Sequence, residues 1–252
     1  MPKTAIIVFP GSNSEEETLR AVQAAGGKGR LVWWFEGPDA LKGFDAFILP
    51  GGFAHEDRIR AGAVAARDPI MIAVLDAARS GAPVLGICNG AQVLVEAGLV
   101  PGTDKIGKPQ AALAPNVQGH YVDRYAEIEL AAPPERCLFT RHLEPGTRIP
   151  TWSSHGEGRF CFRDDHTRRR ILDEHLVVFT YVGGAHNGAE FDCAALTNPP
   201  GNVLAIMPHP ERAGWRYQQL ERVRFEARGD REAFLAPCGG SRLFALFAQV
   251  FA

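Results

Sequence analysis

The residue with the clearest chemical potential is Cys88, which stands between two glycines in the stretch Gly86-Ile87-Cys88-Asn89-Gly90. This spacing matches the Gly-x-Ser-x-Gly nucleophile elbow, with sulfur in place of oxygen. Small neighbours are needed there because the nucleophile occupies a strained turn between a strand and a helix. The N-terminus of the helix also favours the thiolate, which is the reactive form of cysteine. A buried free cysteine between two turn glycines explains the same pattern.

A second chemically active group, His209-Pro210-Glu211, follows the apolar run 203–207. A nucleophilic cysteine needs a base that takes its proton and later gives it to a leaving amine, and histidine suits this role near neutral pH. Glu211 is close enough in sequence to orient the imidazole, and Pro210 restricts the backbone between them. Taken alone, the pattern is more typical of a strand-end histidine beside a surface glutamate.

Gly51 and Gly52 follow the apolar run 44–49 and supply a third feature. Glycines allow backbone N–H groups to approach a developing oxyanion, although an ordinary loop also explains them. Taken jointly, the three features provide a nucleophile, an oriented base and an oxyanion donor. This combination argues against three unrelated local explanations.

A doubly wound sheet would bring these residues together. Continuous apolar runs predict strands at 5–9, 31–35, 44–49, 84–87 and 203–207, and helical spacing predicts helices after Ser14, Asp68 and Cys88. Strands that alternate with helices indicate an α/β fold with a mostly parallel sheet and flanking helices. Ligands bind at the C-terminal ends of such strands. We therefore expect Cys88, Gly51-Gly52 and the loop 11–13 to share one rim.

The chain after Gly102 is richer in short strands. They are predicted at 117–119, 125–130, 148–152, 159–162 and 176–182. Helices are predicted at 168–175, at 215–226 and near the C-terminus, the last burying Leu243, Phe244, Leu246, Phe247 and Val250. No internal repeat or low-complexity linker occurs, so we expect one domain over residues 1–252 with an added β-rich section.

Composition excludes several classes of function. The 252 residues carry a net charge of −2, which gives no footprint for nucleic acid. The five cysteines include no C-x-x-C pair, so neither a disulfide framework nor a zinc site is expected. No apolar run approaches the length of a membrane span, and the first residues lack the layout of a signal peptide. We therefore expect a cytoplasmic protein without a metal and without a membrane partner.

Three stretches resemble the class I, or triad-type, glutamine amidotransferases: Leu49-Pro50-Gly51-Gly52-Phe53, Gly86-Ile87-Cys88-Asn89-Gly90 and Met207-Pro208-His209-Pro210-Glu211-Arg212. More narrowly, the chain resembles the glutaminase subunits of phosphoribosylformylglycinamidine synthases. That match rests on the stretches 8–13, 60–63, 88–92 and 155–159. The resemblance runs from about residue 4 to 213, weakens over 104–150 and is largely absent from 214 to 238.

The resemblance implies a flavodoxin-like fold that hydrolyses L-glutamine with a Cys88, His209 and Glu211 triad through a glutamyl thioester. The oxyanion and substrate-binding residues it implies are Gly51, Gly52, Phe53, Asn89 and Gln92. We expect His155, Glu157 and Arg159 to belong to a loop that senses or docks the synthetase. An additional catalytic role for His155 and Glu157 is the alternative. Ser14 stands where the family often has cysteine, and we expect this difference to have little effect.

The same resemblance implies a partner, a large synthetase subunit that uses the released ammonia to make formylglycinamidine ribonucleotide in de novo purine synthesis. A small bridging subunit is a further expected partner. No cofactor is expected in this chain, which has no Walker loop, whereas ATP and Mg are expected in the synthetase. The alternatives are another class I amidotransferase or a stand-alone amidase, and a non-enzymatic binding module on the same sheet.

Overall fold

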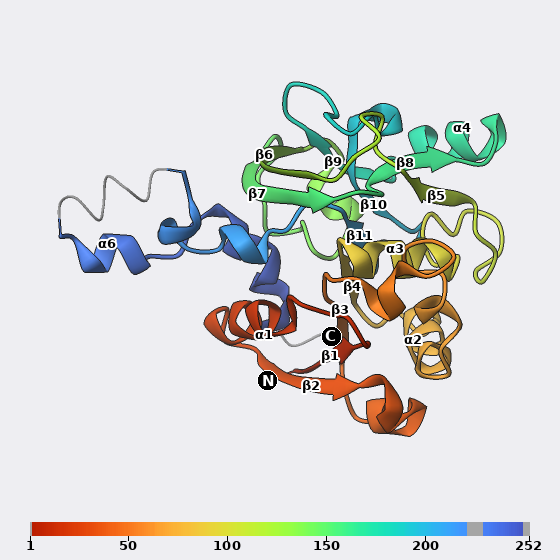
Figure 1. Cartoon of the computed structure of the whole chain (residues 1–252), viewed down its shortest axis with the longest axis horizontal. Helices are drawn as coiled ribbons and strands as arrows, with labels where there is room; N and C mark the ends of the chain where they lie inside the picture. The colour runs from red at the N-terminus through yellow and green to blue at the C-terminus, as the bar shows by residue number, and fades with distance from the viewer. Residues whose placement is uncertain (1, 221–228, 249–252) are drawn as a thin grey trace.

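The computed structural model describes residues 2–220 and 229–248. Its centre is a nine-stranded sheet in the order β2-β1-β3-β4-β11-β10-β9-β6-β7, beside a two-stranded sheet of β5 and β8 (Figure 1). The strands are β1 Lys3–Val8, β2 Lys28–Trp33, β3 Ala46–Leu49, β4 Val84–Ile87, β5 Ala111–Ala114, β6 Val122–Leu130, β7 Arg148–His155, β8 Arg159–Phe162, β9 Val177–Tyr181, β10 Cys193–Thr197 and β11 Val203–Ile206. The α-helices are α1 Glu15–Ala24, α2 Ile70–Arg79, α3 Asn89–Glu96, α4 Asp165–Asp173 and α6 Arg231–Leu235.

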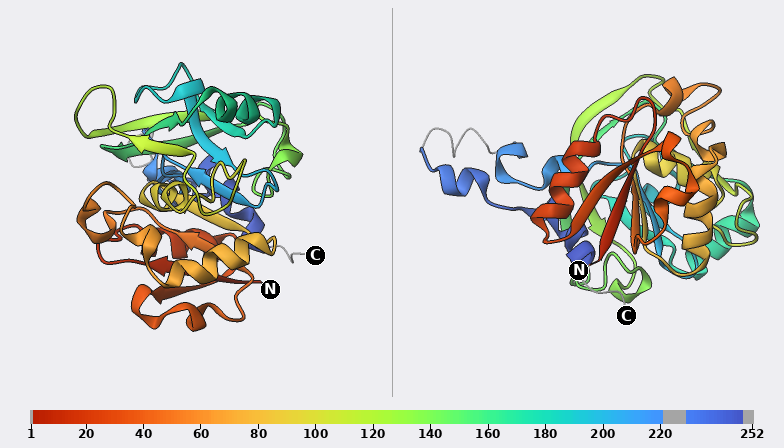
Figure 2. Two further views of the ribbon diagram at one scale, coloured as in Figure 1. Left: turned by 90° about the vertical axis from the view of Figure 1, so that its right-hand side faces the viewer. Right: turned by 90° about the horizontal axis from the view of Figure 1, so that it is seen from below.

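The first half of the sheet is parallel. β2, β1, β3, β4 and β11 pair with one another in parallel in that order, and β3, β4 and β11 are buried along their whole length. Strands buried on both faces read as continuous apolar runs, which is why the sequence revealed them. Figure 2 shows α1 on one face of these strands and α2 on the other. The predicted doubly wound α/β fold is confirmed.

The second half of the sheet is antiparallel and contains most of the predicted β-rich section. β10, β9, β6 and β7 extend the main sheet beyond β11. This half curls back toward the parallel half. The curl is seen in an isolated β-bridge between Trp152 in β7 and His209, just after β11. The outermost strand of the sheet therefore returns to the edge of the parallel half.

The local predictions differ from the structure at four places. The segment 117–119 is a turn, closed by a hydrogen bond from the Gly119 N–H to the Asn116 carbonyl, with Gly119 at a positive φ. Two strands, β5 and β10, were not predicted; both contain several alanines, which have weak strand propensity. The predicted strand 31–35 is displaced, since β2 ends at Trp33 and a 3-10 turn follows.

The C-terminal part departs from the sheet. In place of the predicted helix 215–226 the structure has a 3-10 turn, Arg216–Gln218, and residues 221–226 lie outside the described residues. The C-terminal helix is a 3-10 helix, Gly239–Ala248, which buries the predicted Leu243, Phe244, Leu246 and Phe247, whereas Val250 lies outside the described residues. Between these elements α6 projects from the body of the molecule (Figures 1 and 2).

Candidate active site

Cys88 lies at the turn between β4 and α3, with φ 50° and ψ −106°. This conformation is strained for a residue with a side chain, as expected of a nucleophile elbow. A Cβ atom at Gly90 would lie 1.9 Å from the Leu49 carbonyl oxygen, and one at Gly86 would lie 2.6 Å from the Gly90 carbonyl oxygen. Both glycines are therefore required by close backbone packing, and the turn has the geometry that the sequence predicts for an elbow.

The imidazole of His209 is held by Glu211. Nδ1 of His209 lies 2.5 Å from Oε1 of Glu211, and both side chains are buried. Because a carboxylate only accepts hydrogen bonds, Nδ1 is the donor in this pair. Nε2 is thereby left for the hydrogen bond between His209 and Cys88.

Burial alone would lower the pKa of His209, because it disfavours the charged imidazolium. The charges of Glu211 and Cys88 and the hydrogen bonds to both outweigh burial and raise the pKa of His209 to about 9. His209 therefore carries a proton near neutral pH. An imidazolium is the form of histidine that can protonate a leaving amine.

Gly51 packs directly against this imidazole. A Cβ atom at Gly51 would lie 2.5 Å from Cε1 of His209, so no larger residue fits. The Gly51 N–H donates to the Ser14 hydroxyl at 2.8 Å. Ser14 occupies the N-cap position of α1, but its side chain makes no capping hydrogen bond. It holds the loop after β3 instead, because that loop crosses the end of β1.

Gly52 and Asn89 belong to the predicted oxyanion and substrate-binding residues. Gly52, at φ +150°, pairs with Ser12 in a β-bridge whose hydrogen bonds come from the N–H groups of Phe53 and Asn13. The bridge therefore does not use the Gly52 N–H. Asn89 is the first residue of α3, so its N–H has no acceptor within the helix. The ends of β1, β3, β4 and β11 share one rim, as predicted.

The side chains of Asn89 and Gln92 tie three segments together. Asn89 accepts the Ala54 N–H at 3.0 Å and donates to Gln92 at 2.9 Å. Gln92 donates to the Glu157 carbonyl at 2.7 Å. These bonds join the loop after β3 to the segment after β7. The remaining predicted residue, Phe53, is 44% exposed and lies beside the ring of Tyr121.

The three residues expected in a docking loop have different surroundings. His155 is buried, and its Nδ1 lies 3.1 Å from Oδ1 of Asn116. Glu157 accepts the Ala61 N–H at 3.2 Å, and Arg159 donates to the Pro115 carbonyl at 3.0 Å. His155 therefore lies in the interior. A docking role for the segment that contains Glu157 and Arg159 stays a prediction.

Two residues near the nucleophile were missed by the sequence reasoning. The carbonyl oxygen of Ser154 lies 3.6 Å from Sγ of Cys88, and the Ser154 hydroxyl bonds to the hydroxyl of Tyr121 at 2.8 Å. Neither residue belongs to a motif with a known chemical role. Only the return of β7 to the rim places them here, so the sequence carried no usable signal for them.

Asp57 is a further acidic group in this region. Its partial burial, reinforced by the charge of Glu157 and only partly offset by a hydrogen bond from Asn89, raises the pKa of Asp57 to about 6. Its carboxyl accepts from Asn89 Nδ2 at 3.1 Å. This hydrogen bond ties the loop after β3 to the first residue of α3.

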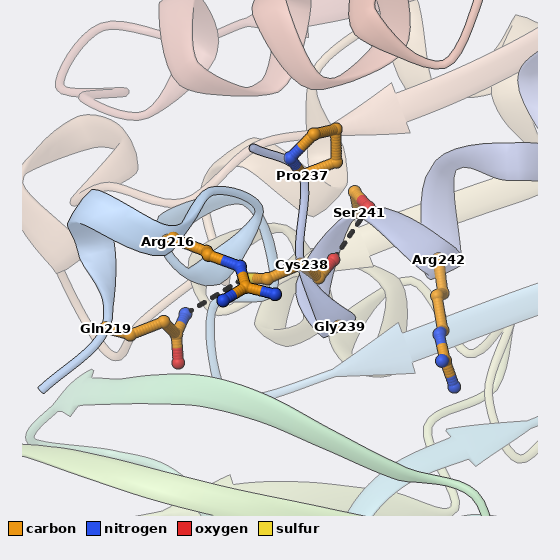
Figure 3. Close-up of a pocket in the computed structure, with 7 residues that line it drawn as sticks. All are labelled: Arg216, Gln219, Pro237, Cys238, Gly239, Ser241 and Arg242. Atoms are coloured by element: carbon orange, nitrogen blue, oxygen red, sulfur yellow. Dashed lines mark hydrogen bonds between the residues drawn. The ribbon is translucent and has the colours of Figure 1, made fainter. Parts of the chain in front are cut away.

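The described residues include no group of three or more histidine, cysteine or acidic side chains placed to hold a metal ion. None of the helices within 2–220 and 229–248 has the length and apolar character needed to cross a membrane. A pocket of about 550 Å³ lies on the C-terminal part of the chain, lined by Arg216, Gln219, Pro237, Cys238, Gly239, Ser241 and Arg242 (Figure 3). It includes no residue of the predicted triad.

Known proteins are similar to this chain in sequence and in fold. The family model for CobB/CobQ-like glutamine amidotransferase domains matches residues 1–228. The PurQ subunit of phosphoribosylformylglycinamidine synthase from Frankia casuarinae is 41% identical over 211 residues, 84% of each chain. The PurQ subunit of Methanothrix thermoacetophila is 36% identical over 234 residues, 86% of this chain and 88% of its own.

Solved structures agree with these relatives. A chain of the PurLQS structure from Thermotoga maritima superimposes with a TM-score of 0.77 at 30% identity, over 98% of this chain and 97% of that one. A glutamine amidotransferase from the same organism, at 16% identity and a TM-score of 0.53, over 97% of this chain and 96% of that one, shares the fold. With the nucleophile elbow and the His209–Glu211 pair on one rim, these similarities show that the chain belongs to the glutamine amidotransferases, within the family of PurQ subunits of phosphoribosylformylglycinamidine synthase.

Proposed function

We propose that this chain hydrolyses L-glutamine at Cys88 and delivers the ammonia to the synthetase subunit of phosphoribosylformylglycinamidine synthase. The observation that carries the proposal is the strained Cys88 turn beside a buried His209 that Glu211 keeps protonated. A purely structural cysteine would need neither the strained turn nor the buried ion pair.

The first half of the reaction forms a thioester. Sγ of Cys88 attacks the side-chain amide carbon of glutamine, and the N–H groups of Gly52 and Asn89 stabilise the negative charge on the carbonyl oxygen. His209 gives its Nε2 proton to the amide nitrogen. The C–N bond then breaks, ammonia leaves, and a glutamyl group remains on Cys88.

The second half releases glutamate. A water molecule attacks the thioester carbon while the now neutral His209 takes one of its protons. The C–S bond breaks, which restores the Cys88 thiolate and the imidazolium. Glu211 holds the ring through both steps, and its charge stabilises the imidazolium each time it forms.

The partners follow from the relatives. The Thermotoga maritima relative was solved as PurLQS, and the curated relatives are named as subunits of a synthase. We infer a large synthetase partner, which would bind ATP and Mg, and a small bridging subunit. A cytoplasmic location is consistent with five free cysteines. The alternative is glutamine hydrolysis that serves another synthetase or none.

The decisive experiment is glutamine hydrolysis by this chain with and without the synthetase and its substrates. We expect stimulation by the partner and complete loss in Cys88→Ala, whereas synthesis from added ammonia persists in the assembled complex. Hydrolysis that ignores the partner would contradict the pathway assignment. Loss of ammonia-dependent synthesis in an assembled Cys88→Ala complex would contradict the division of labour between the subunits.

A further inference from the structure

The buried carboxylate of Glu211 is held by one side-chain hydrogen bond. Its Oε1 lies 2.5 Å from Nδ1 of His209, whereas its Oε2 has no hydrogen-bond partner among residues 2–220 and 229–248. A carboxylate can accept several hydrogen bonds, and a buried one is normally fixed by them. The direction of this carboxylate depends instead on where the backbone of Glu211 is held. The contacts of that backbone therefore also affect the imidazole of His209.

Gln218 holds the backbone of Glu211 from outside the stretch 207–212 that carries the base and the carboxylate. Nε2 of Gln218 donates to the Glu211 carbonyl at 3.2 Å, and Oε1 of Gln218 accepts the Trp215 N–H at 3.0 Å. Because a backbone N–H can only donate, the amide oxygen must face Trp215 and the amide nitrogen must face Glu211. These two bonds fix the orientation of the Gln218 side chain.

The backbone of Gln218 is connected to His209 as well. The Gln218 carbonyl accepts the indole N–H of Trp152 at 3.0 Å. Trp152 lies in β7 and forms the isolated β-bridge with His209. Gln218 therefore contacts the backbone of Glu211 directly and is joined to the backbone of His209 through one residue.

The turn that carries Gln218 is itself anchored to the C-terminal segment. The Cys238 N–H donates to the Gly214 carbonyl at 2.8 Å. A Cβ atom at Gly240 would lie 2.3 Å from the Pro210 carbonyl oxygen, so the backbone at Gly240 packs against the chain just before Glu211. A side chain on a turn that is fixed in this way can hold a catalytic group in one place.

We propose that Gln218 is a positioning residue for glutamine hydrolysis, which holds the backbone of Glu211 so that the carboxylate keeps the imidazole of His209 directed at Cys88. The inference rests on the proposed function, because the reaction that it serves is hydrolysis at Cys88. Gln218 acts through Glu211 and takes no part in binding glutamine. The rate constant kcat should therefore depend on Gln218, whereas KM should not. A misplacement of about 1 Å in a reacting geometry can cost about 10²-fold in rate.

The test removes the amide of Gln218 in the assembled synthase. Gln218→Met keeps the length of the side chain but makes neither hydrogen bond. The matched control is Gln219→Met, because Gln219 is the next residue, is also half-buried, and donates to the Ala213 carbonyl at 3.2 Å. For each complex, kcat and KM for glutamine, the pH dependence of kcat and the thermal unfolding are measured.

We expect Gln218→Met to lower kcat by about 10- to 100-fold with little change in KM. The alkaline limb of its pH–rate profile should move to lower pH, because a displaced carboxylate raises the pKa of His209 less. Cys88 and His155, the other titratable groups that interact with His209, are unchanged in both variants. Gln219→Met should lose as much thermal stability but keep kcat and the alkaline limb. Equal losses of kcat in the two variants would overturn the proposal.

Two further variants separate the effect on Glu211 from the stability of the turn. Gln218→Glu keeps an acceptor for the Trp215 N–H, but its ionised carboxylate has no proton for the Glu211 carbonyl, so it should lose as much activity as Gln218→Met. In a Glu211→Gln background, Gln218→Met should lower kcat far less than it does in the wild type, because two residues that act as one unit are not additive.

Wild-type kcat in Gln218→Glu would overturn the positioning role, and so would full additivity in the double variant. Absence of glutamate formation by the wild-type complex would instead contradict the proposed function.

Discussion

His209 and Trp152 exchange two backbone hydrogen bonds, with the His209 N–H 2.8 Å from the Trp152 carbonyl and the Trp152 N–H 3.3 Å from the His209 carbonyl. The two residues come from segments that stand four strands apart in the order of the main sheet. This contact fixes the backbone of the proposed base against β7. It also brings Ser154 of β7 to the nucleophile, so the curl of the sheet completes the site.

The first prediction concerns the orienting carboxylate. Glu211→Gln keeps the size of the side chain but removes the charge that helps to raise the pKa of His209, so burial should bring that pKa below its value of about 9. A smaller fraction of the His209 side chains would then carry the proton that the leaving amide nitrogen needs to depart as ammonia. We expect kcat for glutamine hydrolysis to fall by about 10²- to 10⁴-fold, and the alkaline limb of the pH–rate profile to move to lower pH. An unmoved limb would show that Glu211 does not act through His209.

The same pair predicts how stability depends on pH. The pKa of His209 is raised in the folded state from 6.5 to about 9, so the pair stabilises the fold fully below pH 6.5 and loses this contribution as pH rises through 9. At pH 6, Glu211→Gln should lower the free energy of unfolding by about 3–5 kcal/mol, as for a broken buried pair. Urea unfolding at pH 6 and pH 9.5 checks this. If the difference in unfolding free energy between the wild type and Glu211→Gln is larger at pH 9.5 than at pH 6, the predicted direction of the pH dependence is wrong.

A third prediction concerns Ser14. Ser14→Ala leaves the buried Gly51 N–H without its acceptor, so the free energy of unfolding should fall by about 1–3 kcal/mol. The glutaminase rate should fall as well, because Gly51 packs against His209. Ser14→Cys should have an intermediate effect, because sulfur accepts weakly. Ser80→Ala, at an exposed helix end, is the matched control and should change stability by less than about 0.5 kcal/mol. Equal effects of Ala at both serines would exclude a special role for Ser14.

A fourth prediction uses two glycines near the site. Gly90→Ala places a Cβ atom 1.9 Å from the Leu49 carbonyl oxygen, and neither backbone can move without opening the elbow. We expect a loss of about 1–3 kcal/mol or more in stability and loss of glutaminase activity. Gly156→Ala is the matched control, since its Cβ atom would meet only Cδ2 of Tyr121 at 3.8 Å. Thermal unfolding of both variants decides whether the close approach at Gly90 is required.

Sequence reasoning was reliable where burial on both faces of the sheet gives a strand a continuous apolar run. The strands β3, β4 and β11, and β1 from Ala5 onward, are continuous apolar runs because they are covered on both faces, and each strand was predicted within about two residues of its observed bounds. It failed for β10, because Ala194 and Ala195 have weak strand propensity, although the strand is buried throughout. Its place in the sheet comes from antiparallel pairing with β11, across the loop 198–202, and with β9 on its other side.

The sequence by itself determined the local parts of the site. The Cys88 turn follows from glycines two residues away, and the His209–Glu211 pair follows from residues two positions apart. Only the tertiary structure decided the contacts of Ser14 with Gly51, of Asn89 with Ala54 and of Ser154 with Cys88. These contacts join segments 35 to 66 residues apart in sequence. They depend on strand order, strand register and the curl of the sheet, which no short stretch of residues encodes.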